Sequence, residues 1–193
     1  MTALRKIRLA LTPNAAPFAI RAEKASDVVA REALLDACFG ENRSLRTCQR
    51  LRDGRAPAEG LAFSTMAEGY LVGTLRLWHV SAGGIPALML GPLAVEASYR
   101  KFGVGTALMD HALAAATTRG HRAVILLGDA PYYSRFGFSG EKMAGLSLPG
   151  PFERDRLLGR ELILGALDGA SGMIVPTGAK ATPVRRAQRA RAA

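Results

Sequence analysis

The stretch from Leu88 to Leu108 constrains the fold of this chain more than any other part of the sequence. It begins as an apolar, strand-like segment and is interrupted at Gly91-Pro92, where proline has no N–H to donate to a neighbouring strand. After Val95 comes a polar turn with two cations and two closely spaced glycines, and a helical pattern comes next. A strand, a glycine-containing turn and a helix in this order predict an α/β fold.

The turn after Val95 has the features of an anion-binding site. Gly103 and Gly105 allow the backbone to turn tightly and to bring bare N–H groups close to a ligand. The helix after the turn adds unpaired N–H donors and the positive end of its dipole. Arg100 and Lys101 supply cations that suit phosphate oxygens. The turn therefore predicts a site for a phosphate-bearing ligand.

Two common nucleotide motifs do not match this turn. Leu108 stands where a dinucleotide-binding fingerprint has its third glycine, and Gly105-Thr106-Ala107 lacks the lysine of a P-loop. The segment Arg100-Lys101-Phe102-Gly103-Val104-Gly105 instead resembles the acyl-CoA pyrophosphate signature, Arg/Gln-x-x-Gly-x-Gly/Ala, of the GNAT superfamily of N-acetyltransferases. The preceding Leu93-Ala94-Val95 is also typical of that family.

A second motif strengthens the resemblance. The run Asp129-Ala130-Pro131-Tyr132-Tyr133-Ser134-Arg135-Phe136-Gly137-Phe138 predicts a short helix with a proline in its first turn and a glycine at its end. It resembles the GNAT element Tyr-x-x-x-Gly-Phe, and Tyr133 takes the place of the family's functional tyrosine. With Leu148-Pro149-Gly150-Pro151, the sequence is similar to a bacterial branch of the family that is labelled YhbS-like.

Hydrophobic periodicity predicts the remaining elements. The expected strands are 18–21, 61–67, 70–80, 85–95 and 123–127; the expected helices run from Ser26 or Asp27 to Gly40, within 44–52, and over 104–119. In the strand 70–80, Leu71, Leu75 and Leu77 share one predicted face. Strands 85–95 and 123–127, joined by a helix, should be parallel within an otherwise antiparallel sheet. We therefore predict an α/β (α+β) chain with the mixed, mostly antiparallel sheet of the GNAT fold.

Length and composition indicate one globular domain with two extensions. The 193 residues are 49% hydrophobic, which suits a single core. We assign 1–17 to a leader without a long hydrophobic region, 18–168 to the N-acetyltransferase domain and 169–193 to a C-terminal extension. No apolar run approaches the ~20 residues of a membrane-spanning helix, so no membrane partner is expected. Cys38 and Cys48 are too few for a disulfide framework, which favours a cytoplasmic protein.

Part of the net charge of +10 lies near the C-terminus. From Pro176 to Ala193 there are five cations and no acidic residue, in a stretch rich in Ala, Pro and Thr without a core-forming pattern. We predict that this tail is disordered. It is either a solvated terminus or an anchor for nucleic acid or another polyanion, and a nucleic-acid-binding protein acting through it is one alternative function.

The resemblance implies how acetyl-CoA, the expected cosubstrate, would bind, and no metal is expected. If Gly91-Pro92 bends its strand away from 123–127, rather than merely ending it, the parallel pair splays and leaves backbone groups free for the pantetheine arm. Backbone amides of the next turn would hold the pyrophosphate, and Tyr133 would serve the departing CoA sulfur. The expected cosubstrate-binding residues are Leu93, Ala94, Val95, Arg100, Lys101, Phe102, Gly103, Val104, Gly105 and Thr106.

The acceptor amine and the general base are not identified by the sequence. The resemblance implies acceptor contacts between Glu41 and Arg55, for a small-molecule or protein amine. The candidate bases are Glu23, Glu96, Asp129 and His79, of which each could equally be a structural or surface group. We predict an acetyl-CoA-dependent N-acetyltransferase that is a monomer or a homodimer. The alternative is an acyl-CoA-binding sensor without turnover.

Overall fold

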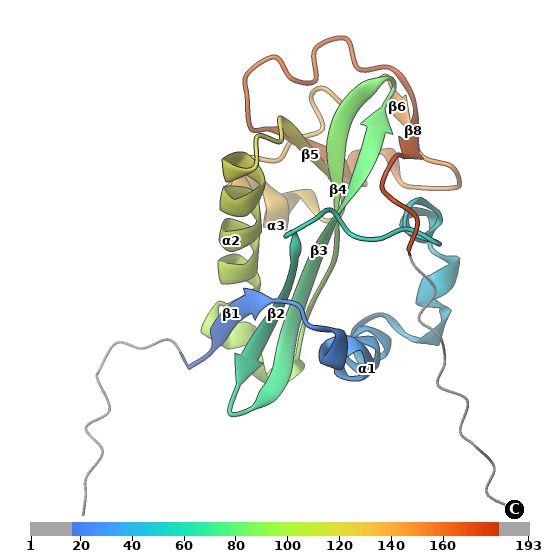
Figure 1. Cartoon of the computed structure of the whole chain (residues 1–193). Coiled ribbons are helices and arrows are strands. Elements are labelled where there is room, and N and C mark those ends of the chain that lie inside the picture. The colour runs from blue at the N-terminus through green and yellow to red at the C-terminus, as the bar shows by residue number, and fades with distance from the viewer. Residues whose placement is uncertain (1–16, 182–193) are drawn as a thin grey trace, which may run out of the picture.

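The structure is a computed structural model that describes residues 17–181, and it consists of a mixed sheet with helices on both faces (Figure 1). The strands are β1 (Ala19–Ala22), β2 (Ala62–Ala67), β3 (Tyr70–Ala82), β4 (Ile85–Val95), β5 (Ala123–Leu127), β6 (Leu146–Ser147), β7 (Leu157–Glu161) and β8 (Gly172–Pro176). The α-helices are α1 (Val28–Phe39), α2 (Val104–Thr118) and α3 (Ala130–Tyr133). Short 3-10 helices cover Ala25–Asp27, Glu41–Leu45, Thr47–Leu51, Ala97–Phe102, Ser134–Phe136 and Arg154–Arg156.

The main sheet has the strand order β1-β2-β3-β4-β5-β7. Neighbouring strands are antiparallel except for β4 and β5, which are parallel and joined through α2. The crossover through a helix is what a parallel pair requires, because its strands cannot be joined by a tight turn. The predicted mixed, mostly antiparallel sheet with one central parallel unit is confirmed. None of the described helices is long and apolar enough to cross a membrane.

The two parallel strands are paired over only part of their length. Leu88 lies opposite Val124 and Met89 opposite Ile125, and no pairing between the strands continues beyond these residues. β4 runs on beside β3, with a register shift at Gly91-Pro92, while β5 continues beside β7. A bulge of this kind bends a strand and changes the direction of the residues after it. The predicted bend is therefore confirmed, and the alternative that Gly91-Pro92 ends the strand is wrong.

The two long helices cover opposite faces of the sheet. On one face α2 packs its buried side chains, among them Leu108 and Met109, against Leu75 and Leu77. On the other face, the buried Leu34 and Leu35 of α1 pack with Ala94 and the partly buried Leu71. The prediction that Leu71 shares a face with Leu75 and Leu77 is wrong. A register shift between Thr65 and Met66 in the β2–β3 pairing changes the side to which Leu71 points.

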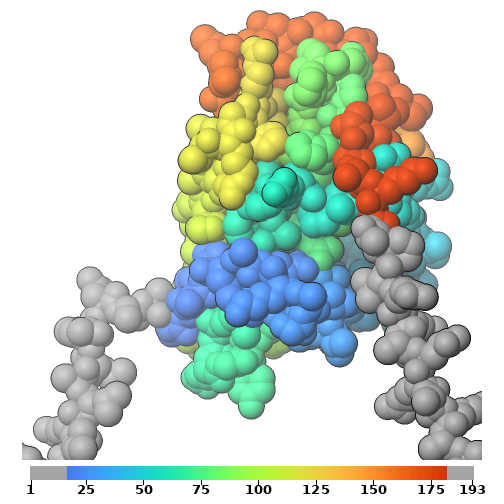
Figure 2. Space-filling model, in the orientation of Figure 1, coloured from blue at the N-terminus to red at the C-terminus, as the bar shows by residue number. Residues whose placement is uncertain are grey.

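The sheet extends beyond the predicted domain limit at residue 168. β8 pairs with the end of β3, and its Ile174 is fully buried. The chain then bridges from Lys180 to Arg55, and Ala56 N–H donates to Ala179 O at 2.8 Å, so that the C-terminal residues lie against the segment near residue 55 (Figure 2). The predicted disorder of 176–181 is wrong. The four arginines of the basic tail, Arg185, Arg186, Arg189 and Arg191, lie outside the described residues.

Replacing Ile174 with alanine should lower the free energy of unfolding by about 3 kcal/mol, because it opens a cavity where β8 joins the core. Val175→Ala on the same strand is the matched control, since Val175 is 44% exposed and should cost less than about 1 kcal/mol. Urea unfolding of both variants measures the difference. No loss for Ile174→Ala would show that β8 contributes nothing to the core, and equal losses in the two variants would show that burial of Ile174 is not the cause.

Candidate active site

The start of α2 presents the backbone amides of Gly105 and Thr106, which have no acceptor within the helix. Gly103 has a left-handed conformation with φ 77°, which turns the chain into the helix. Ala107 N–H is the first amide of this turn to find a helical partner, Gly103 O at 3.0 Å. Gly105 and Thr106 are partly exposed, and their N–H groups have no partner within α2, whereas Val104 is fully buried, so its N–H is closed to a ligand. Such a set of N–H groups at a helix start binds anions.

The other residues of the predicted pyrophosphate loop have different surroundings. Arg100, Lys101 and Phe102 end a 3-10 helix, whose own i→i−3 bonds take up their amides. All three side chains are exposed. The Arg100 guanidinium folds back and donates through Nε to Val95 O at 3.2 Å. Of the predicted amide donors, Gly105 and Thr106 are thus the ones at the helix start that are open to a ligand.

The free edge of β4 offers backbone groups where β5 has diverged. Glu96 N–H donates to Val72 O at 2.9 Å, so this opposed pair is hydrogen-bonded. Because hydrogen-bonded pairs alternate along an antiparallel ladder, Ala94 turns its backbone groups to β3, while those of Leu93 and Val95 point away from β3. Leu93 therefore matches the prediction of free groups, and Ala94 differs from it. Val95 matches it only through its N–H, because its carbonyl accepts from Arg100 Nε and Cys38 Sγ.

Two adjacent tyrosines connect the start of α2 with the opening between the strands. Their rings are 4.8 Å apart and nearly perpendicular. Tyr132 lies against α2, because a Cβ added to Gly105 would stand 2.9 Å from its hydroxyl oxygen. Tyr133 lines the pocket beside the strand ends, and its ring packs so closely on Gly128 that a Cβ there would overlap it. Only Tyr133 is placed to act inside the pocket.

The hydroxyl group of Tyr133 stays protonated at neutral pH. Burial raises the pKa of Tyr133 to about 12, and the charge of Asp129 acts in the same direction. No described residue forms a hydrogen bond with this hydroxyl, so its proton is available to a ligand. Tyr133 can therefore serve as a hydrogen-bond donor in the pocket.

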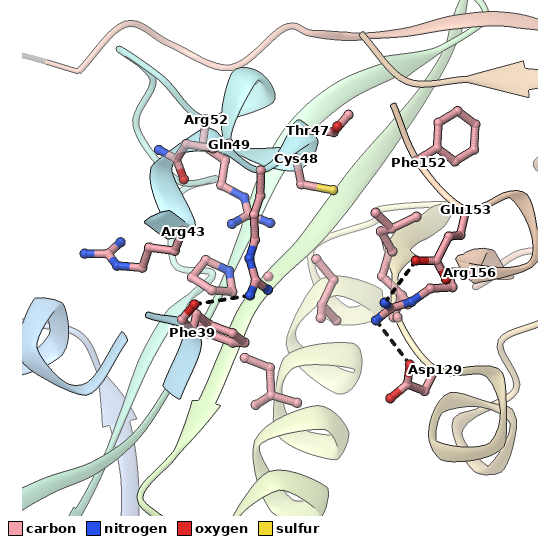
Figure 3. Close-up of a pocket in the computed structure, with 18 of the residues that line it drawn as sticks. Phe39, Arg43, Thr47, Cys48, Gln49, Arg52, Asp129, Phe152, Glu153 and Arg156 are labelled. Atoms are coloured by element: carbon pink, nitrogen blue, oxygen red, sulfur yellow. Dashed lines mark hydrogen bonds and ion pairs between the residues drawn. The ribbon is translucent and has the colours of Figure 1, made fainter. Parts of the chain in front are cut away.

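A pocket of about 630 Å³ opens between the separated strand ends (Figure 3). Its floor includes Leu93 and Leu126 from β4 and β5. One wall is the 3-10 segment between Arg43 and Arg52, which lies within the range where the resemblance implies acceptor contacts. The opposite wall carries Asp129, Phe152, Glu153 and Arg156, and Arg156 lies between the two carboxylates, 3.1 Å from Asp129 and 4.0 Å from Glu153.

Of the candidate bases, the structure brings Asp129 alone to the pocket wall. Glu23 is held in ion pairs with Arg31 and Arg76. Glu96 lies outside the pocket, directly after β4 and at the start of the 3-10 helix Ala97–Phe102. His79 packs its ring 5.3 Å from that of His121 and does not line the pocket, which agrees with a structural role.

Several residues of the pocket were not predicted from the sequence. Arg46 and Arg52 lie within the implied acceptor range but were not singled out, and Phe152, Glu153 and Arg156 were not considered. The last three come directly after Leu148-Pro149-Gly150-Pro151, so this family-like run was a usable signal for a functional loop. Among the described residues, no group of three or more His, Cys, Asp or Glu side chains is placed to hold a metal ion.

The separated parallel strands, the free amides and the pocket tyrosine together define an acetyltransferase of the class that the two motifs indicated. The sequence profile of the acetyltransferase (GNAT) family matches residues 29–138, more than half of the chain. The chain belongs to this family.

Two bacterial proteins are similar to the chain. It is 30% identical over 157 residues to the uncharacterized N-acetyltransferase YhbS of Escherichia coli (strain K12), covering 80% of this chain and 93% of YhbS. The crystal structure of E. coli YhbS in complex with CoA matches with a TM-score of 0.73 at 27% identity, over 86% of this chain and 93% of that one. A GNAT family acetyltransferase from Brucella melitensis, crystallised with acetyl-CoA, shares the fold with a TM-score of 0.56 at 23% identity, over 80% of this chain and 100% of that one.

Proposed function

We propose that this protein transfers an acetyl group from acetyl-CoA to the nitrogen of an amine, which attacks the thioester directly. The observation that carries the proposal is the row of amides at Gly105 and Thr106, in the first turn of α2 beside the opened strands. Pyrophosphate fits such a row, since it has oxygens to accept these N–H bonds and charge to match the helix dipole. The crystallised CoA complex of YhbS supports the same ligand here.

The residues present fit the shape of CoA as well as its charge. Gly105 has no side chain, and a Cβ there would enter the space between α2 and Tyr132. The outward N–H and C=O groups of Leu93 offer a strand-like edge to the amides of a pantetheine arm. Bound acetyl-CoA supplies an activated acetyl group as a thioester. The Leu93 N–H is placed on the open side of β4, where it can donate to the thioester carbonyl oxygen.

Tyr133 and Asp129 are the proposed proton-handling groups. Tyr133 donates a hydrogen bond to the CoA sulfur as the carbon–sulfur bond breaks, because its hydroxyl has no other partner among the described residues. An alkylamine with a pKa of ~10.4 must lose a proton before it attacks. Asp129 accepts this proton directly or through water, since it lies on the pocket wall next to α3.

Release of the CoA thiol in the presence of a panel of amines tests the proposal. We expect thiol release that depends on both acetyl-CoA and an amine, with one N-acetylated product for each thiol. CoA binding by calorimetry without amine-dependent thiol release would instead favour the acyl-CoA sensor. Both thiols of the chain, Cys38 and Cys48, are free, and we propose a cytoplasmic location on that basis.

A further inference from the structure

Arg52 is a cation of the pocket without a carboxylate partner among the described residues. It comes directly after the 3-10 helix Thr47–Leu51, and its guanidinium reaches Gly91, where an added Cβ would lie 3.1 Å from Nη2. Its Nε is buried and forms no hydrogen bond with any described residue. The neighbouring carboxylate, Asp53, instead accepts from Gln49 Nε2 at 2.7 Å. Arg52 as a whole is half-buried, and its buried Nε lacks the partner that buried polar atoms have in folded proteins.

The other arginines of the pocket show what is unusual about Arg52. Arg43 is paired with Glu32 and Asp36, and Arg156 with the acids of the opposite wall. Arg46 donates to Phe39 O at 3.2 Å and forms no ion pair with a described residue. Burial lowers the pKa of Arg52 to about 10, so that its side chain is still charged at neutral pH. One wall of the pocket thus carries two cations that the described residues do not neutralise.

The opposite wall has the other sign of charge. Asp129 and Glu153 share a single cation, Arg156, which leaves one net negative charge there. Figure 3 shows these three residues across the pocket from Arg52. A ligand that fits both walls carries a cationic group toward Asp129 and an anionic group toward Arg52. The pyrophosphate of CoA does not supply this anion, because Arg52 lies at Gly91 within β4, whereas the free amides of α2 lie beyond the end of that strand.

We propose that the acceptor is an amine that also carries a carboxylate, and that Arg52, assisted by Arg46, binds this carboxylate. The inference rests on the proposed acetyl transfer in the same pocket. The planar guanidinium can form two parallel hydrogen bonds with a carboxylate. This bidentate contact fixes the orientation of the ligand as well as attracting its charge. Its amine then faces Asp129 and Tyr133, the groups that the proposed reaction needs. Amino acids and related small amino carboxylates are the corresponding class.

Binding of matched compounds tests the proposal without requiring turnover. The probes are N-acetyl amino acids and the same compounds as carboxamides, titrated by calorimetry into the full chain saturated with CoA. We expect the acids to bind about 10- to 100-fold more tightly than the carboxamides. In Arg52→Gln this ratio should fall to near one, while Arg52→Lys should retain part of it because the charge remains.

Arg50→Gln is the matched control. It removes the same charge from the same 3-10 segment, but Arg50 does not line the pocket and donates to Pro149 O at 2.6 Å. The preference for acids should be unchanged in this variant, and CoA affinity should be unchanged in all of them. Unfolding midpoints identify any variant that loses its fold.

Turnover separates this inference from the proposed function. Amino acids and their amides, O-phosphoethanolamine and a lysine peptide are compared as acceptors in the thiol-release assay. We expect kcat/KM to be highest for the amino acids. Equal use of acids and amides, a preference for the phosphate or the peptide, or no binding of any N-acetyl acid would overturn the carboxylate assignment. Binding of the acids without acetylation of any amine would contradict the proposed transfer and leave Arg52 as a carboxylate site.

Discussion

Replacing Gly105 with aspartate should lower the affinity for CoA by at least about 100-fold, because several charge-assisted hydrogen bonds to the pyrophosphate are lost at once. The new carboxylate would accept the free amides of the α2 start itself and would repel the pyrophosphate. The fold should be kept, since an acidic side chain in the first turn of a helix is favourable with the helix dipole. Calorimetry with CoA and a thermal unfolding curve measure the two effects.

Two further variants separate charge from shape at Gly105. Gly105→Asn adds a side chain of the same size without a charge and should lose less affinity than Gly105→Asp. Ala114→Asp adds the same charge to an exposed position further along α2 and should bind CoA normally. Unchanged CoA affinity in a folded Gly105→Asp protein would contradict the assignment of these amides to pyrophosphate.

Replacing Tyr133 with phenylalanine should reduce kcat by about 10- to 1,000-fold with little change in the affinity for acetyl-CoA. Phenylalanine keeps the ring that packs on Gly128 and removes only the hydroxyl group. Full transfer of the hydroxyl proton to a thiolate of pKa ~8.5 is opposed by about 5 kcal/mol, since the pKa of Tyr133 is raised to about 12. Tyr133 therefore acts as a hydrogen-bond donor rather than as an early acid.

The pH dependence and a neighbouring variant test the same role. A group with a raised pKa keeps its proton as the pH rises, so kcat should not decline through loss of the Tyr133 proton below about pH 11. Tyr132→Phe should have near-normal kcat, because that hydroxyl faces the start of α2. A reversed result, with Tyr132→Phe impaired and Tyr133→Phe normal, would show that the roles of the two tyrosines are exchanged.

Local sequence patterns predicted the parts of the fold that depend on local chemistry. The glycine turn before α2, the bulge at Gly91-Pro92 and the short helix with Tyr133 each depend on residues that are close together in the chain. The prediction for Leu71 was wrong because one extra residue in the β2–β3 pairing reverses the side to which a strand residue points. Strand periodicity alone does not show where such a bulge lies.

The acceptor side of the pocket depends on contacts between distant segments, and this is why it was not predicted residue by residue. Arg52 meets Gly91 only after the 3-10 segment docks on β4, and Glu153 faces it from a loop near the end of the domain. Ala94 was placed among the cosubstrate-binding residues because a sequence run does not show which backbone groups a neighbouring strand takes up. These features come from pairing and docking rather than from composition.

The docking of the C-terminal residues has a consequence for the order in which the site is completed. The strands β4 and β5 and the helix α2, which form the CoA-binding side, lie before residue 128 and are therefore synthesised early. The segment that carries Arg52 is held at its far end by Ala179 and Lys180, which are synthesised much later. During synthesis the CoA-binding half of the protein can thus assemble well before the acceptor half. The wall that carries Arg52 reaches its final position only after Ala179 and Lys180 have left the ribosome.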